Sequence, residues 1–571
     1  MTRRPSASRL FLLRPAPAAP LLCLIALAAA HAQERGEGVV REELVPSAAY
    51  EERGRGVTRE ELDPVMAGDG SGLPHELWSG FSAEALAEAI SVLELPPRSP
   101  TLFALWRRLM SATAPPATGA ERARFTALRI EALDQSGLVD EVAELLAKDP
   151  DADRDPVLSA LKAKNEIELG NFERGCEIAK GLGAANASVP APIRSDIALI
   201  GAACAAQRGD MASAALQAGL LRELEPGLTG ADFLDAVAGG IAPEIPAGAK
   251  LSLLDYRIAA LGGPLDAQKL IAAASPALLA GLAHDPRVPA DLRLAAGEAA
   301  AGLNLLSAED LAPLYRAGGA GADGGSIERA SLFKSAEAER SPLRKARFIR
   351  GFLDEAKRAG LYGPALRLMA GPTRDVTPVA EIGWFAETAI EVAIASGNYD
   401  GARMWASFGA SPYAPSADGA EALAHWVALA DLADPARTSD HARSLAAVEA
   451  LAARGRMDSE LLHRLATVLD ALAITVPIPL WDLASRSPQP AGGYLPDTGV
   501  LSELADAAKK KQFGRTVLLV LRSIGPKGAE GAHMIALGDS VRALKRAGLA
   551  AEARQLAVEG LFAAWPRLVS Q

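Results

Sequence analysis

The stretch LGNFERG at residues 169–175 reads as the end of one helix, a tight turn and the start of a second helix. A residue just past a helix end often adopts the left-handed backbone conformation, which glycine tolerates best, and Gly170 occupies that place. Gly175, five residues further on, lets two antiparallel helices approach closely because it has no side chain. The stretch SGNYDGA at 396–402 has the same form. Both stretches predict helical hairpins.

The same pattern of helix end, glycine and new helix recurs along the chain. Five residues after most of these glycines stands a small residue, and Val142 and Glu460 are the departures. The turn glycines are Gly137, Gly170, Gly209, Gly360, Gly397, Gly455 and Gly548, and the small residues are Gly175, Ala214, Ala365, Ala402 and Ala553.

These turns resemble those of the tetratricopeptide repeat, which read Gly-Asp/Asn-aromatic-x-x-Ala; Gly170-Asn171-Phe172 and Gly397-Asn398-Tyr399 match best. The resemblance implies a TPR-like α-α superhelix, a solenoid of helical hairpins used to hold peptides or other proteins. The chain departs from the family in its spacing, since the intervals between turns are 33, 39, 151, 37, 58 and 93 residues. The large aromatic residue usual in the first helix is also missing. A generic helical bundle with glycine caps is the alternative.

The composition agrees with an all-α protein. The chain has 571 residues, so several packed units are expected, and with 49% hydrophobic but only 5% aromatic residues its core must be aliphatic and Ala-rich. Ala, Leu, Glu and Arg dominate, and such residues favour helices packed through small side chains.

The first 32 residues read as an export signal. Four arginines precede an apolar run from Leu21 to Ala30, and Ala30-His31-Ala32 supplies a small-x-small cleavage site after Ala32. The run is shorter than the roughly 20 apolar residues that a spanning helix needs. We therefore expect a bacterial protein exported to the periplasm or the medium. Its mature charge is (59 − 4) − 70 = −15, which argues against a nucleic-acid partner, and the absence of a later long apolar run argues against stable membrane insertion.

Residues 33–74 are rich in Glu, Arg and Gly and are expected to be a disordered linker. The phrase GVVREELVP at 38–46 returns as GVTREELDP at 56–64. Two weak docking motifs on one tether raise apparent affinity through effective concentration. A local duplication without function, or docking onto the protein's own groove, are the alternatives. The expected anchors are Arg41, Glu42, Glu43, Leu44, Arg59, Glu60, Glu61 and Leu62.

Two helical halves follow the linker. The stretch AGGAGADGG at 317–325 has no apolar anchor and predicts a hinge over residues 317–329. The expected units are therefore an N-terminal hairpin solenoid at 75–316 and a C-terminal one at 330–571.

Cys176 and Cys204 remain after cleavage of the signal. Cys176 lies early in the helix after Gly170, and Cys204 late in the next one. If the chain reverses near residues 185–190, the two face each other on antiparallel helices, which predicts a disulfide in an oxidising compartment. Two buried free thiols are the alternative.

No pattern of catalytic, cofactor-binding or metal-binding residues emerges. The chain has no His-Glu-x-x-His, no zinc-like Cys-His spacing, no Gly-x-Ser-x-Gly and no phosphate-binding loop. We therefore expect a non-enzymatic scaffold or adaptor of the cell envelope that binds unidentified protein partners. The alternatives are a cell-wall-associated enzyme or accessory subunit related to the superhelical domain of lytic transglycosylases, and a structural envelope protein with no specific groove.

Overall fold

The computed structural model describes residues 72–114, 122–318, 324–409, 423–437 and 441–567. Within these ranges every regular element is a helix, and isolated bridges join Leu251 to Ala274 and Tyr494 to Ala532. The predicted all-α class is confirmed. The expected signal peptide and all the doubled-phrase anchors, from Arg41 to Leu62, lie outside the described residues.

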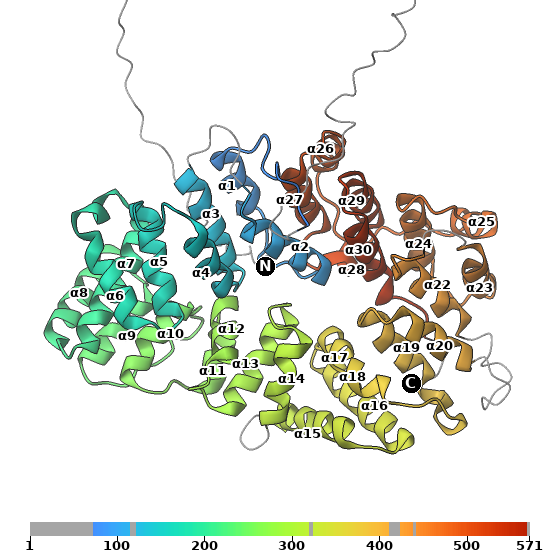
Figure 1. The fold of residues 1–571 in the computed structure, drawn as a ribbon, viewed down its shortest axis with the longest axis horizontal. Coiled ribbons are helices and arrows are strands. Elements are labelled where there is room, and N and C mark those ends of the chain that lie inside the picture. Colours follow the sequence, from blue (N-terminus) through green and yellow to red (C-terminus); the bar gives the residue numbers. More distant parts are fainter. Residues whose placement is uncertain (1–71, 115–121, 319–323, 410–422, 438–440, 568–571) are drawn as a thin grey trace, which may run out of the picture. The chain divides into compact units, whose positions relative to one another are not determined.

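The helices are short and follow one another along the chain, many of them joined by tight turns and some by longer loops (Figure 1). The first part of the chain contains α1 (Ala83–Ser91), α2 (Pro100–Ser111), α3 (Arg122–Gln135), α4 (Val139–Lys148), α5 (Pro156–Glu168), α6 (Phe172–Leu182), η2 (Gly183–Ser188), α7 (Ala191–Gln207), α8 (Met211–Leu224), α9 (Thr229–Ala238), α10 (Leu253–Ala259), η3 (Ala260–Gly262), α11 (Ala267–Ala273), α12 (Pro276–His284), α13 (Ala290–Gly302) and α14 (Ala308–Ala317).

The second part contains α15 (Gly324–Ala338), α16 (Pro342–Arg358), α17 (Tyr362–Leu368), α18 (Ala370–Arg374), η4 (Ala380–Phe385), α19 (Ala386–Ala395), α20 (Tyr399–Gly409), α22 (Ala424–Ala433), α23 (Ala442–Ala453), α24 (Ser459–Ala471), α25 (Ile478–Arg486), α26 (Thr498–Lys509), α27 (Phe513–Ile524), α28 (Gly528–Gly531), α29 (Met534–Arg546) and α30 (Ala550–Phe562). In both parts most helices pack against the next one along the chain, as in α5 with α6 and α19 with α20.

Every turn glycine named from the sequence joins two helices and has a positive φ, from 68° at Gly455 to 93° at Gly548. Each turn closes with the same two backbone bonds. At Gly170, for instance, the glycine N–H donates to Ile167 O and the next N–H, of Asn171, donates to Glu166 O. This is the Schellman motif, which satisfies carbonyl groups left open at a helix end.

The small residues after the turns lie where the two helices of a hairpin touch. Ala214, Ala365, Ala402 and Ala553 are buried. At Gly175 a Cβ atom would lie 2.6 Å from Ile167 Cδ1 and 3.0 Å from Ala163 O, so only glycine fits between α5 and α6. The close approach expected from the sequence is therefore a physical feature of this hairpin.

The Gly-rich segment separates α14, which ends at Ala317, from α15, which begins at Gly324. A buried carboxylate connects the helices on the two sides of this segment. The carboxylate of Glu298 on α13 accepts hydrogen bonds from Arg329 Nε on α15, at 2.7 Å, and from Tyr315 Oη on α14, at 2.8 Å. The division into two halves at 317–329 stays a prediction, and residues 319–323 lie outside the described part.

The first helices of the described chain contact the last ones. α2 packs against α30 and α27 (Figure 1). Arg108 Nη1 on α2 pairs with Glu552 Oε1 on α30 at 2.6 Å, and the Gly514 N–H donates to Leu77 O at 3.0 Å. The sequence offered no sign of this junction, because repeat units contact only their neighbours in an open stack.

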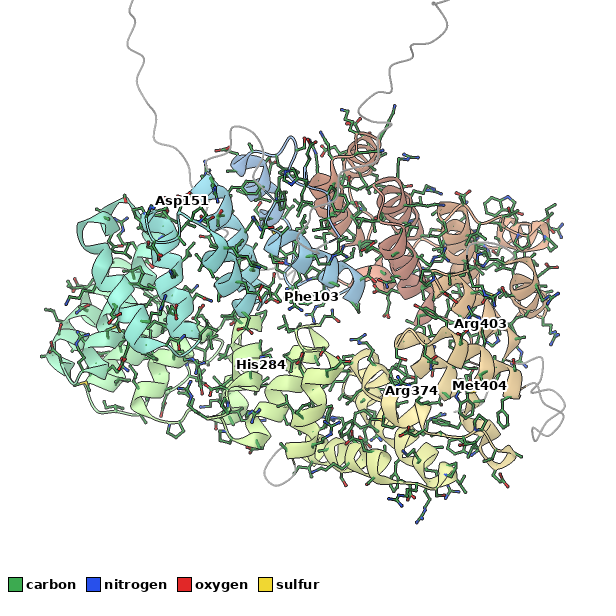
Figure 2. All side chains as sticks on the ribbon, in the orientation of Figure 1. Phe103, Asp151, His284, Arg374, Arg403 and Met404 are labelled. Atoms are coloured by element: carbon green, nitrogen blue, oxygen red, sulfur yellow. A yellow bond between two sulfur atoms is a disulfide. The ribbon has the colours of Figure 1, made fainter. Side chains whose placement is uncertain are left out.

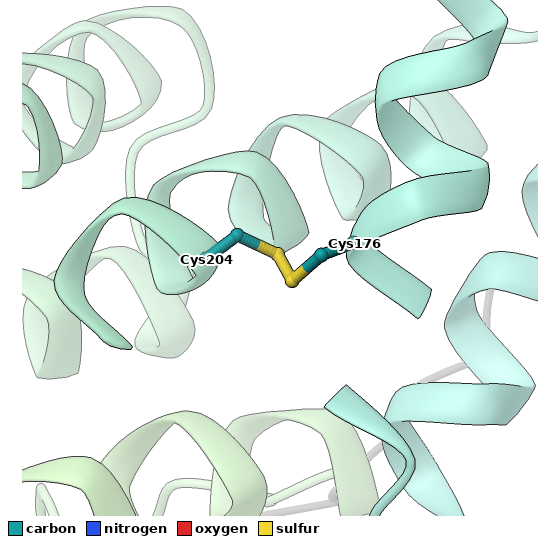
Figure 3. Close-up of a disulfide and its surroundings, with 2 residues drawn as sticks. All are labelled: Cys176 and Cys204. Carbon is teal, nitrogen blue, oxygen red and sulfur yellow. A yellow bond between two sulfur atoms is a disulfide. The ribbon is translucent and has the colours of Figure 1, made fainter. Parts of the chain in front are cut away.

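Cys176 on α6 and Cys204 on α7 form a disulfide, with their Cα atoms 5.9 Å apart (Figure 3). The short helix η2 lies between the two helices and covers the expected reversal near residues 185–190. The bond therefore ties the second helix of one hairpin to the first helix of the next. Among the residues described, no helix combines the length and the apolar character required to cross a lipid bilayer.

Candidate functional site

A cavity of about 560 Å³ opens to solvent where two hairpin turns meet α10 and α12. The turn between α3 and α4 and the turn between α5 and α6 form one wall. The opposite wall comes from α10, α12 and the loop that follows α12. The polar lining residues are Arg107, Asp140, Glu141, Glu168, Asn171, Arg257, His284, Asp285, Arg287 and Asp310.

A buried ion pair anchors the cavity wall. Arg257 on α10 donates from Nη1 to Asp285 Oδ2 at 2.6 Å and from Nε to Glu168 O, at the end of α5, at 3.0 Å. Arg257 and Asp285 are both buried. One guanidinium thus joins the C-terminus of α5 to the loop after α12. Cations are favourable at a helix C-terminus, where unpaired carbonyl groups gather.

A second arginine uses the same carboxylate. Arg287 donates from Nε to Asp285 Oδ1 at 2.9 Å and from Nη2 to Asp285 Oδ2 at 2.7 Å. These hydrogen bonds, with those from Arg257, hold the pKa of the Asp285 carboxyl well below its usual range. Two guanidinium groups share one carboxylate, so this wall carries a local excess of positive charge.

Arg287 lies over the glycine turn between α5 and α6. A Cβ atom at Gly170 would stand 2.9 Å from Arg287 Nη2, and its φ of 88° also requires glycine. The guanidinium remains largely exposed, because the Arg287 side chain keeps 68% of its surface accessible. It can therefore pair with a ligand without leaving Asp285.

Two helices begin at the cavity. α4 starts after Leu138 and α6 after Asn171, and neither cap residue makes a side-chain hydrogen bond to the first turn. Their first N–H groups are thus available to acceptors. Acidic groups partly offset this positive character, since Glu141 in the first turn of α4 pairs with Arg107 and Asp140 is exposed beside it.

An acidic cluster lies behind the α5 wall. Lys164 Nζ is 2.8 Å from Asp134 Oδ2, 3.6 Å from Asp196 Oδ2 and 3.8 Å from Glu168 Oε1. Burial raises the pKa of the Glu168 and Asp196 carboxyls. Burial also raises the pKa of the nearby Glu131 carboxyl to about 7. Several carboxyl groups thus surround one ammonium group, between α3, α5 and α7.

The residues singled out from the sequence are distributed unevenly around this site. Gly137 and Gly170 line the cavity. The turns at Gly209, Gly360, Gly397, Gly455 and Gly548 lie elsewhere in the fold, and so does the disulfide of Cys176 and Cys204.

Sequence reasoning did not find Arg257, Asp285 or Arg287. The one local signal was Asp285-Pro286, a dipeptide that favours a turn. Figure 2 marks His284, the last residue of α12, directly before this turn. The pairing of Arg257 with Asp285 joins residues 28 positions apart, and no helical periodicity reveals it.

The described lining residues of the cavity include no serine, threonine, cysteine, tyrosine or lysine, and their titratable side chains are carboxylates, arginines and His284. In the described part of the chain, no three His, Cys, Asp or Glu side chains are grouped to hold a metal ion. What the site presents is charged groups of both signs and unpaired backbone donors.

No family model, no curated protein and no solved structure matches this chain.

Proposed function

We propose that the protein is a non-enzymatic scaffold or adaptor of the bacterial cell envelope, which binds a segment of a partner polypeptide in the cavity between the Gly137 and Gly170 turns. The observation that carries the proposal is the lining of this cavity. It is open, it is large enough for several residues of a peptide, and its donors are held in place by buried ion pairs.

The exposed guanidinium of Arg287, rather than the net charge of the lining, indicates the kind of segment. Arg257 and Arg287 share the single carboxylate of Asp285, which leaves one guanidinium uncompensated at the rim. A carboxylate can accept two parallel hydrogen bonds from an exposed guanidinium group such as that of Arg287. The first N–H groups of α4 and α6 favour the same sign of charge. The segment is therefore a peptide that carries at least one acidic side chain or a free carboxyl end.

The proposal has two further elements: the helical hairpins form a TPR-like solenoid, and the protein is exported from the cytoplasm. Support for the solenoid comes from the Schellman turns, which recur with a small buried residue such as Ala214 or Ala553 after them. Support for export comes from the disulfide of Cys176 and Cys204, since disulfides persist in oxidising compartments.

The doubled phrase at 38–46 and 56–64 is proposed as a tethered pair of docking motifs, with Leu44 and Leu62 as anchors. Two weak contacts on one tether strengthen each other only if both are present. Replacing both leucines with serine in the full chain should weaken partner capture much more than either replacement alone. Equal effects of the single and double variants would contradict the proposal.

Site-specific crosslinking tests the cavity. A photoreactive residue in place of His284 is compared with one at Ile478, an exposed residue of α25, in envelope extract. We expect one crosslinked protein from position 284 and none of the same mass from position 478. The substitution Arg287→Glu should lower its yield by about tenfold, as for loss of a charged anchor.

Arg486→Glu is the matched control, because Arg486 pairs with Asp482 at 2.8 Å on the exposed face of α25. It should leave the yield unchanged. If Arg287→Glu and Arg486→Glu behave alike, or if both photoreactive positions capture the same proteins, the cavity is not the binding site.

A further inference from the structure

Five carboxyl groups from four helices gather around one ammonium group behind the α5 wall of the cavity. We call these six side chains the Lys164 cluster: Glu131 and Asp134 on α3, Lys164 and Glu168 on α5, Asp196 on α7 and Asp255 on α10. Lys164 Nζ lies 2.8 Å from Asp134 Oδ2, 3.6 Å from Asp196 Oδ2 and 3.8 Å from Glu168 Oε1. The cluster therefore connects helices of several successive hairpins.

The cluster holds more potential negative charge than its cation can offset. Burial raises the pKa of the Glu131 carboxyl, and the charge of Lys164 opposes this only in part. The carboxyl groups of the cluster also raise one another's pKa values. A further cation, Arg257, acts on Glu168 but is itself bound to Asp285 at 2.6 Å. Like charges this close repel one another when all are ionised, so the folded arrangement favours a bound proton.

Charged groups on the helices packed around the cluster form ion pairs of their own. These pairs are Glu84 with Arg124, Arg107 with Glu141, Glu144 with Lys148, Lys162 with Asp153, and Glu166 with Arg174. Asp140 of α4, Arg194 of α7 and His284 of α12 are exposed to solvent. The balance of charge inside the cluster is therefore set mainly by its own six members.

The helices that meet at the cluster also form the cavity. α3 leads into the Gly137 turn, α5 leads into the Gly170 turn, and α10 carries Arg257. Glu168 belongs to both places, because its buried side chain lies 3.8 Å from Lys164 Nζ and its backbone oxygen accepts the hydrogen bond from Arg257 Nε at 3.0 Å. A change in the spacing of these helices therefore moves both turns and the guanidinium that connects them.

We propose that the Lys164 cluster is a proton-dependent switch of the cavity wall. While the cluster holds a proton, α3, α5 and α10 stay together, and the Gly137 and Gly170 turns stand as in the structure. When the cluster loses that proton, repulsion among its carboxylates separates the helices locally and opens the wall. This regulation rests on the proposed function, since the site that it controls is the proposed peptide cavity.

An acidic segment should bind best to the protonated state. Glu168 lines the cavity, so a charge on its side chain acts on the bound segment. Only 3% of that side chain is accessible, and a buried charge is screened much less than an exposed one. Protonation of the cluster removes part of this repulsion and keeps the Gly170 turn in place beneath Arg287.

The pH range of the switch follows from Glu131. Burial raises the pKa of the Glu131 carboxyl to about 7, against about 4.3 for an exposed glutamate. Such a group stabilises the wall fully below the lower value and loses that effect as the pH rises through the higher one. The wall should therefore hold at about pH 5 and open at about pH 8.

Hydrogen exchange of the full chain, followed by mass spectrometry at pH 5 and pH 8, tests the switch without any ligand. Dividing each rate by that of an unstructured peptide removes the direct effect of pH on exchange. We expect the protection of the backbone amides at residues 163–175 and 253–259 to fall by about tenfold or more at pH 8. The amides of α29, which packs against α24, α26, α27 and α30, should keep their protection.

Glu131→Gln and Asp196→Asn each remove one titrating group and should keep both segments protected at pH 8. Either variant alone suffices if the other fails to fold. Glu503→Gln, which changes an exposed carboxylate paired with Arg515, should follow the wild type. Wild-type protection that does not change with pH overturns the proposal. A fall that both cluster variants retain, or that α29 shares equally, also overturns it.

The photoreactive residue in place of His284 separates the switch from the proposed function. Its crosslinking yield in envelope extract should fall by about tenfold from pH 5 to pH 8, and Glu131→Gln should keep the yield high. Proton-dependent exchange without a crosslink at either pH would support the switch and contradict the peptide cavity. Equal crosslinking at both pH values, with constant protection, would support the peptide cavity and overturn the switch.

Discussion

Glu559 on α30 accepts a hydrogen bond from the backbone N–H of Thr101 on α2, with 2.8 Å between Thr101 N and Glu559 Oε1. The hydroxyl groups of Thr101 and Ser99 donate to the same carboxylate. Ser99 is the N-cap of α2, so a carboxylate from the end of the chain satisfies the start of a helix near its beginning. This contact joins residues 458 positions apart and holds α2 and α30 together.

The substitution Glu559→Ala should destabilise the protein by about 3 kcal/mol, because it leaves a buried N–H and two hydroxyl groups without an acceptor. The free energy of unfolding from urea titration measures the loss. Glu503→Ala is the control, since Glu503 and Arg515 form an exposed pair at 3.6 Å, and pairs of this kind contribute little. Equal losses in the two variants would show that the α2–α30 junction does not depend on Glu559.

The stability should fall as the pH rises through the range between about 4.5 and 7. Burial raises the pKa of the Glu131 carboxyl to about 7 in the folded protein. Its pKa in the unfolded chain is near 4.3, so between these values the folded state binds more protons than the unfolded state. The stabilising contribution is complete below the unfolded pKa and is lost as the pH approaches 7. The loss from Glu131 alone is on the order of 3 kcal/mol.

Urea titrations at pH 5 and pH 8, for the wild type and for Glu131→Gln, measure this effect. The glutamine variant has no titrating group at this position and should lose less stability between the two pH values. Glu503→Gln, which changes an exposed carboxyl on α26, should follow the wild type. The same pH dependence in wild type and Glu131→Gln would assign the effect to other carboxyls of the Lys164 cluster.

Reduction of the disulfide between Cys176 and Cys204 should lower the free energy of unfolding by about 3–4 kcal/mol, as loop entropy predicts for a separation of 28 residues. The double variant Cys176→Ser with Cys204→Ser should match the reduced wild type, with or without reductant. Alkylation of the unreduced protein followed by intact-mass measurement checks the bond itself. Modification of both thiols under these conditions would contradict the disulfide.

Two substitutions of opposite kind test the left-handed turns. Gly455 has a φ of 68° and free space around it, so Gly455→Ala costs only the backbone strain, about 1 kcal/mol. Ala473, exposed after α24, has a φ of 58°, and Ala473→Gly should relieve a similar strain and stabilise the protein. Chemical denaturation of both variants measures the free energy of unfolding, which should fall for Gly455→Ala and rise for Ala473→Gly. Stabilisation by Gly455→Ala, or destabilisation by Ala473→Gly, would refute the argument.

The helical hairpins could be predicted from local sequence because their turns are local. Gly170 and Gly397 mark helix ends through a conformation that glycine alone adopts without strain. The same reasoning missed the turns at Asn304, Ala473 and Lys511, which have positive φ without being glycines. At Lys511 the helix end still closes with the same bonds, Gln512 N–H to Ala507 O among them. Phe513, two residues after Lys511, is buried, and its burial helps to offset the local strain.

The candidate site was far less predictable. Gly137 and Gly170 pointed to two turns, but nothing in the sequence shows that both face the same cavity. Arg257 and Asp285 look like ordinary charged residues of amphipathic helices until the fold buries them against each other. Their role in anchoring the cavity wall follows from burial. A buried charge without a partner is costly, so the two side chains are held against each other.

The amino-acid sequence by itself determined where helices begin and end, because caps, glycines and helix propensity act within a few residues. It also determined that α5 and α6 pack closely, through the absence of a side chain at Gly175. Only the tertiary structure decided which distant helices meet, as at Thr101 and Glu559, and which charges converge, as at Arg257 and Asp285. These contacts depend on how every turn between the two helices orients the next helix. No local sequence pattern determines the combined effect of so many turns.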